Sequence, residues 1–153
     1  MKKMSVNTII NLVAAIVLVV SLIMIEVSFG TAQGWFDTNY NPLILFLAIL
    51  GILLLLAVAG LNIAGIGKDN GVVSLLKLFF SVGACACAGV IFGLVMGAIA
   101  TEFAYTFFSD FNKGTPKEHF MPAACTQAVL GMILCLVTIV AAAAANAFDE
   151  QRK

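Results

Sequence analysis

The chain has 153 residues, of which 62% are hydrophobic and only 10% are charged, and its mean hydropathy is +1.09. A soluble domain carries roughly 25% charged residues, so this composition excludes a water-covered globular fold and indicates a protein that lies in lipid. The formal net charge is zero and the sequence has no dense cluster of Lys and Arg, which argues against nucleic acid as a partner.

The first apolar run covers residues 8–29, close to the ~20 residues needed to cross ~30 Å of hydrocarbon. It follows Lys2 and Lys3, as the apolar part of a signal peptide would. That part is only about 7–15 residues long in signal peptides, and the chain after this run stays apolar. We therefore predict a retained transmembrane helix.

Three more apolar runs predict three more transmembrane helices. The second begins after Pro42 and the fourth begins at Pro122. Proline is tolerated at a first helical position because its missing N–H has no helical acceptor there. The ranges are 43–66, 74–100 (to 109 in an alternative with a longer helix) and 122–148.

Basic residues near the helix ends set the expected orientation, because Lys and Arg are retained on the cytoplasmic side. With the amino terminus inside, six of the eight basic residues lie on the inner side. These six are Lys2, Lys3, Lys68, Lys77, Arg152 and Lys153, and the outer two are Lys113 and Lys117. The outer loops would then be 30–41 and 101–120, and the inner loop 67–71.

The sequence thus predicts a single all-α domain over residues 1–153, a polytopic membrane protein folded as a four-helix bundle with both termini in the cytoplasm. We expect a multi-pass protein of the plasma membrane. The basic start and the compact loops favour a bacterial inner membrane.

Glycines recur every fourth residue in the third run, at Gly89, Gly93 and Gly97. Residues four apart share a helix face, and in lipid a face of small residues lets two helices approach closely. The matching small residues of the fourth run are Ala124, Ala128 and Gly131. We expect this glycine zipper to pack within the bundle. Packing against another subunit and a glycine-lined ion path are the alternatives.

Aromatic residues crowd the predicted outer side. Tyr and Trp rings favour the headgroup layer of a membrane, which is the simplest interpretation. Alternatively, the rings fold into a compact outer cap or dock onto a larger membrane partner. The residues of this outer aromatic cap are Trp35, Phe36, Tyr40, Phe103, Tyr105, Phe107, Phe108 and Phe111.

Two carboxylates, Glu26 and Glu102, are predicted at similar heights near the outer surface. We expect each to reach headgroup water independently. The alternative hypothesis is an outer-face polar site that also includes Lys113, Lys117 and His119. Two converging carboxylates would repel each other unless a proton, a loop cation or a metal ion lay between them.

Polar side chains inside the spans are few, and no ionisable Asp, Glu, Lys, Arg or His lies near the middle of the membrane. Proton-coupled pumps usually need such a group. The main polar residues in the spans are Asn11, Ser21, Asn62, Ser81, Thr126, Gln127 and Thr138.

Four cysteines lie in or beside the apolar runs. Cys85 and Cys87 are two residues apart, about 200° around a helix, so they face nearly opposite ways and cannot share a metal ion or a disulfide. We expect small-residue packing for these two and for Cys125 and Cys135. Redox or metal chemistry and lipidation are the alternatives.

The sequence contains no nucleophile–base pair, metal-binding motif or phosphate-binding loop, so we expect no enzyme, no cofactor and no metal site. The favoured interpretation is a non-catalytic subunit of a larger membrane assembly, such as a transporter or channel complex. Its partners would be the lipid bilayer and other membrane-protein subunits or copies of itself. The alternatives are a self-sufficient small transporter or pore acting as a homo-oligomer, and an outer-loop binding or immunity-type protein.

Overall fold

The computed structural model describes residues 5–31, 39–65, 71–108 and 122–150, with side chains described up to Ala104 and again from Cys125 to Ala147. The four helices are α1 (Val6–Thr31), α3 (Leu43–Ile63), α4 (Gly71–Phe108) and α5 (Pro122–Glu150). Each contains a stretch long and apolar enough to cross a membrane, and the described ranges contain no strand. The predicted all-α, four-span membrane fold is confirmed.

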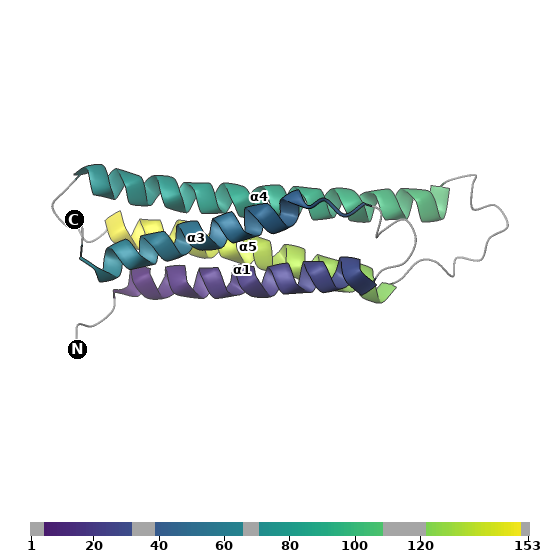
Figure 1. Cartoon of the computed structure of the whole chain (residues 1–153), viewed down its shortest axis with the longest axis horizontal. Helices are drawn as coiled ribbons and strands as arrows, with labels where there is room; N and C mark the ends of the chain where they lie inside the picture. The colour runs from purple at the N-terminus through teal and green to yellow at the C-terminus, as the bar shows by residue number, and fades with distance from the viewer. Residues whose placement is uncertain (1–4, 32–38, 66–70, 109–121, 151–153) are drawn as a thin grey trace.

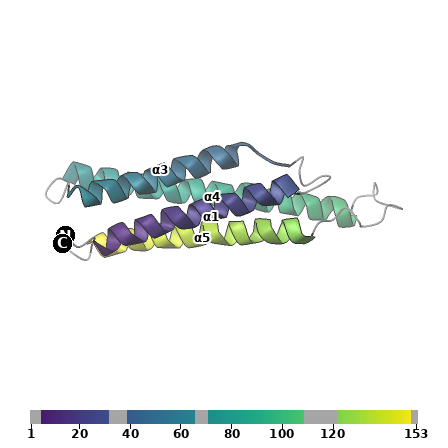
Figure 2. The same cartoon turned by 60° about the horizontal axis from the view of Figure 1, so that its bottom comes forward.

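The helices form a closed ring in which each one is antiparallel to its two neighbours (Figures 1 and 2). α1 contacts α3 and α5, and α4 contacts the same two helices from the other side. The pairing of α1 with α5 is the most extensive of the four. The start of α1 and the end of α5 lie at the same end of the bundle, here called the terminal end, and the opposite end is called the far end.

Local capping explains where α1 and α3 begin. Ser5 Oγ accepts a hydrogen bond from the backbone N–H of Thr8 at 3.2 Å, the usual way in which serine satisfies a free amide at a helix start. Asn41 Oδ1 accepts one from the backbone N–H of Leu43 at 3.0 Å, beside Pro42. The helix begins at residue 43 as the sequence predicts, with Pro42 at the N-cap rather than at the first helical position.

The C-terminus of α3 differs from the prediction. The helix ends at Ile63 rather than at residue 66, because Gly65 adopts a positive φ of 68°. Glycine takes this left-handed conformation without a steric penalty and commonly ends helices.

Helix α4 follows the longer of the two predicted ranges, since it continues to Phe108. At 1.5 Å per residue its 38 residues extend about 57 Å, whereas the 21 residues of α3 extend about 32 Å. Figure 1 shows that α4 continues past the other three helices at the far end. One segment of the chain therefore exceeds the hydrocarbon thickness by a wide margin.

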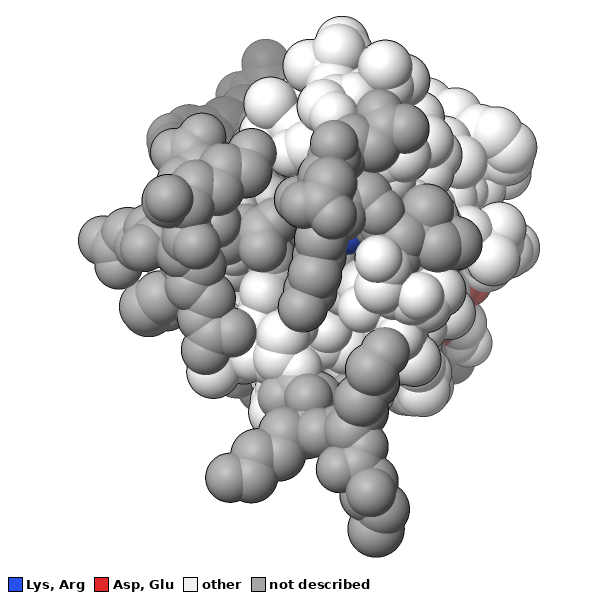
Figure 3. Space-filling view, turned by 90° about the vertical axis from the view of Figure 1, so that its left-hand side faces the viewer, with Lys and Arg blue, Asp and Glu red and all other residues white. Residues whose placement is uncertain are grey.

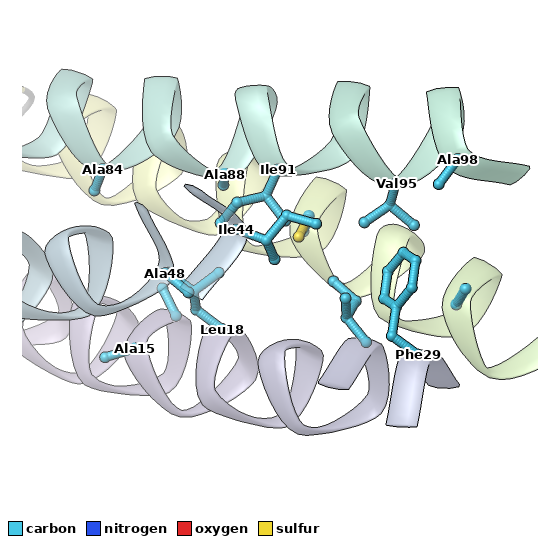
Figure 4. Packing of buried hydrophobic residues seen from close by; sticks show 14 of the residues in the cluster. Ala15, Leu18, Phe29, Ile44, Ala48, Ala84, Ala88, Ile91, Val95 and Ala98 are labelled. Atoms are coloured by element: carbon cyan, nitrogen blue, oxygen red, sulfur yellow. The ribbon is translucent and has the colours of Figure 1, made fainter. Parts of the chain in front are cut away.

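Large and small apolar side chains alternate in the core (Figure 4). Leu18, Ile44 and Ile91 fill its centre, and each is at most 1% exposed. Fully buried alanines lie between them and let the helices approach one another. These alanines are Ala14, Ala84, Ala88, Ala128, Ala142 and Ala145. Lipid tails are as apolar as these side chains, so the packing itself rather than exclusion of water holds the helices together.

The closest packing joins α1 to α5. A Cβ placed on Gly131 would lie 2.6 Å from Cγ1 of Ile25 and 3.1 Å from the backbone oxygen of Ser21. Ser21 Oγ donates a hydrogen bond of 2.7 Å to the carbonyl of Gly131 and lies 3.1 Å from Sγ of Cys135. This contact therefore combines backbone approach with an interhelical hydrogen bond, the two attractions that remain strong in lipid.

The tight contact at Gly131 predicts that Gly131→Ala destabilises the protein by about 1–3 kcal/mol, because the added methyl group overpacks the contact with Ile25 and Ser21. Alanine has the better helix propensity, by about 1 kcal/mol in water. Propensity alone would therefore make Gly131→Ala stabilising, whereas the tight contact predicts destabilisation. Thermal unfolding of the purified protein in detergent measures the change.

The matched control is Gly60→Ala. Gly60 is also a helical glycine, but a Cβ there would meet no described atom within 4 Å. This variant should melt at or above the temperature of the parent. Equal behaviour of the two variants would show that the close approach at Gly131 is not required.

Candidate functional site

The glycines of α4 do not face the bundle. A Cβ added at Gly89, Gly93 or Gly97 would have no described atom within 4 Å, and all three residues are exposed. The prediction that this zipper packs within the bundle is therefore wrong for the described structure. The cause is helical phase: α4 turns Ala84, Ala88, Ile91 and Val95 inward, and at 100° per residue the glycines fall on the opposite side.

The proposed partners of those glycines in α5 have a different role. Gly131 packs against α1 rather than α4, and Ala128 is fully buried in the core. Ala124 belongs to the part of α5 whose side chains the structure does not describe. A small residue does bring two helices together at Gly131, but the pair is α1 with α5 and not the predicted pair of α4 with α5.

The exposed face of α4 carries a row of small residues, here called the glycine strip. Its members are Ala86, Gly89, Gly93, Gly97, Ala100 and Ala104, all of them exposed. The row spans 18 residues, or about 27 Å of helix. Val90 and Met96, 47% and 50% exposed, stand on either side of it. The strip therefore presents only backbone and methyl groups on the outside of the bundle.

At the far end, Glu26 of α1 is paired with Tyr40, which lies just before α3. Tyr40 Oη donates a hydrogen bond of 2.7 Å to Oε1 of Glu26. The Tyr40 ring also packs edge-on against Phe29, with 5.3 Å between ring centroids and 67° between planes. Burial, followed by the hydrogen bond and the charge of Glu26, raises the pKa of Tyr40 to about 12. This group fixes the start of α3 to α1.

Glu102, the other carboxylate, lies on the inward side of α4 and is only 3% exposed. It lies within electrostatic range of Cys125 on α5, whereas Glu26 bonds to Tyr40. The described contacts thus give the two carboxylates different neighbours. Lys113, Lys117 and His119 lie outside the described residues, so the outer-face polar site stays a hypothesis.

Two members of the predicted outer aromatic cap have described side chains. Tyr40 packs on Phe29, and Phe103 is 42% exposed. The cap as a whole stays a prediction. Tyr105, Phe107 and Phe108 have described backbone only, and Trp35, Phe36 and Phe111 lie outside the described residues.

All four cysteines are free thiols, and three of them are buried. Cys85 Sγ lies 3.8 Å from the carbonyl of Ile139 on α5, while Cβ of Cys87 faces Gly51 on α3. The two side chains thus face different helices, as their spacing predicts. No group of three His, Cys, Asp or Glu side chains suited to a metal ion occurs within the described ranges.

No protein-family model, curated protein or solved structure matches this chain. The class therefore rests on the fold: four apolar helices define a multi-pass membrane protein with a helical bundle in contact with lipid. The features of this bundle that offer chemistry are the glycine strip, the Glu26–Tyr40 pair and the buried polar side chains.

The Glu26–Tyr40 bond predicts coupling in a double-mutant cycle of Glu26→Gln and Tyr40→Phe. Hydrogen bonds to charged groups contribute more than neutral ones, so we expect a coupling of about 1–2 kcal/mol in thermal unfolding. Phenylalanine keeps the ring that packs on Phe29, which confines the change to the hydroxyl. Additive effects of the two substitutions would contradict the bond.

The same pair predicts a pH dependence with a definite sign. The pKa of Tyr40 is raised from 10.0, so the folded state holds the phenol proton more tightly than the unfolded state does. The stabilisation is complete below pH 10 and is lost as the pH rises towards about 12. The parent protein should therefore lose more stability than Tyr40→Phe over this interval.

Proposed function

We propose that this protein is a non-catalytic subunit of a larger membrane assembly, such as a transporter or channel complex, and that it docks through the glycine strip of α4. The observation that carries the proposal is the exposure of Gly89, Gly93 and Gly97 on the side of α4 away from its own bundle. The occupant we infer is a transmembrane helix of another subunit.

The cost of these glycines supports an external partner. Each glycine inside a helix is about 1 kcal/mol less favourable than alanine in water, and the three exposed glycines of the strip contact no described atom of the bundle that could offset this. Contact with lipid alone needs no glycine. A second helix gains from it, because its backbone can come close enough for dispersion contacts and Cα–H···O bonds.

The composition of the core favours a subunit over a self-sufficient pore. Leu18, Ile44 and Ile91 close the centre of the ring, and each is at most 1% exposed. The polar groups nearby, Ser21 and Cys135, already bond to each other and to the backbone. A solute would therefore meet a dry barrier inside a single bundle. A homo-oligomer would have to form its path between copies.

Substitution in the strip tests the proposal. Gly93→Leu should leave the thermal stability of the isolated bundle close to that of the parent, because its side chain would point into open space. It should remove the co-purifying partner chain or reduce the mass of the complex in mild detergent, because leucine prevents close backbone approach. Mass measurement of the purified complex also separates a foreign partner from a second copy.

Gly60→Leu is the matched control, since Gly60 is an exposed helical glycine on α3 with no described atom within 4 Å of an added Cβ. It should keep the partner. Retention of the full assembly by Gly93→Leu would show that the strip faces lipid only, and the proposed docking surface would be withdrawn.

We also propose that both termini lie in the cytoplasm and that the membrane is a plasma membrane, specifically a bacterial inner membrane. The support is the distribution of Lys and Arg along the sequence. Six of the eight lie near the two chain ends or near the junction of the second and third spans, namely Lys2, Lys3, Lys68, Lys77, Arg152 and Lys153. The start of α1 and the end of α5 lie at the same end of the bundle, so both are expected on the same side of the membrane.

Labelling of introduced cysteines tests this orientation. With the native cysteines replaced, Asn39→Cys and Asn112→Cys should react with an impermeant thiol reagent added outside intact cells, and Asn70→Cys should react only after lysis. The reverse pattern would invert the topology. Asn39 lies beside Tyr40 at the far end of the bundle.

A further inference from the structure

Polar side chains gather in the core at the terminal end of the bundle. They come from all four helices, and four of them are buried, with Asn7 at 7%, Thr8 at 1%, Asn11 at 0% and Ser81 at 0% exposure. The full set is Asn7, Thr8, Asn11, Asn62, Ser81 and Asn146. Figure 3 views the bundle from this end, where the described surface shows very few charged side chains. The cluster itself consists only of the uncharged side chains of Asn, Ser and Thr.

Hydrogen bonds connect this cluster in two groups. Asn7 Oδ1 accepts from the side-chain amide of Asn11 and, at 3.4 Å, from that of Asn62 on α3. Asn146 Nδ2 donates to Ser81 Oγ at 2.9 Å, which joins α5 to α4. These hydrogen bonds therefore join α1 to α3 and α4 to α5 at the terminal end of the bundle.

One atom in this network lacks a bond. Asn11 Oδ1 is buried and has no hydrogen-bond partner. The amide orientation is fixed, because Nδ2 donates to both the backbone oxygen and Oδ1 of Asn7, and a flip would set oxygen against oxygen. An unsatisfied buried acceptor costs about 1–3 kcal/mol, and in native proteins such an atom is usually bonded to internal water.

Asn11 lies near the terminal end of the bundle. Asn11 lies five residues after the start of α1, about 7.5 Å along the helix. The half-buried Asn62 and the nearly buried Asn7 stand between it and the helix ends. Beyond it the core turns apolar at Ala14 and Leu18.

We propose that the terminal end of the bundle is a hydrated site, in which water enters past Asn62 and Asn7 and donates a hydrogen bond to Asn11 Oδ1. Water fits this site better than a metal cation does. Asn7 Oδ1 already accepts from two amide donors, and Asn11 Oδ1 is the one buried oxygen of this cluster without a partner, whereas Ca²⁺ or Mg²⁺ takes six or more ligands. Leu18 marks the inner limit of the water.

Cysteine reactivity measures the hydration directly, because the reactive thiolate forms readily in water and poorly in an apolar core. The reporter is Val58→Cys on α3. Asn62 lies opposite Asn7 and Gly51 lies opposite Leu18, so the antiparallel register puts Val58 opposite Asn11. This reporter leaves the asparagine network intact.

The full chain is reconstituted in lipid vesicles with its native cysteines replaced, and a small charged methanethiosulfonate reagent is given access to both sides. Val58→Cys should react at least about tenfold faster than Leu18→Cys, whose position is equally buried but deeper. Adding Asn11→Leu to Val58→Cys should remove most of that advantage, because the acceptor that holds the water is gone.

Asn62→Cys serves as the positive control at the entrance and should react in every case. Equal, slow reaction of Val58→Cys and Leu18→Cys beside a reactive Asn62→Cys would overturn the hydrated site, since the core would be dry at Asn11. Rapid reaction that persists in the Asn11→Leu background would also overturn it, because the water would then not depend on Asn11.

Discussion

The fold depends above all on the contact between the first and the last helix. In lipid, apolar surfaces gain nothing from exclusion of water, so a bundle needs places where backbones meet and polar groups pair. Gly131 supplies the close approach, and the 2.7 Å bond from Ser21 supplies the polar pair. The other three contacts each join helices that follow one another in the sequence. The contact between α1 and α5 is the one that closes the ring.

The architecture could be predicted from the sequence because it follows from length and hydropathy. Four apolar runs, prolines at two helix starts and a glycine after α3 are local signals, and each corresponds to a described element. The error of three residues at the end of α3 has a local cause as well, because Gly65 adopts a positive φ just after the helix.

Which face of a helix turns inward could not be predicted in the same way. A lipid-facing side and a core-facing side are both apolar here, so hydropathy carries little information about helical phase. The spacing of Gly89, Gly93 and Gly97 correctly predicts a helix face made of small residues. It does not predict whether that face turns toward the bundle or away from it. Gly51, by contrast, belongs to no such spacing, and yet a Cβ added there would lie only 3.0 Å from Cδ2 of Leu18. Its role appears only with the partner helix in place, and the same is true of Ser21.

The bond from Ser21 to Gly131 has a consequence for biosynthesis, because its two residues are separated by 110 positions in the chain. At translation rates of about 5–20 residues per second, α1 waits roughly 5–20 s for the helix that satisfies its serine. During this interval Ser21 has no carbonyl of α5 to which it can donate its hydrogen bond. The nascent chain therefore needs either the insertion machinery or the early α1–α3 hairpin, tied by Asn7 and Asn62, to hold α1 until synthesis is complete.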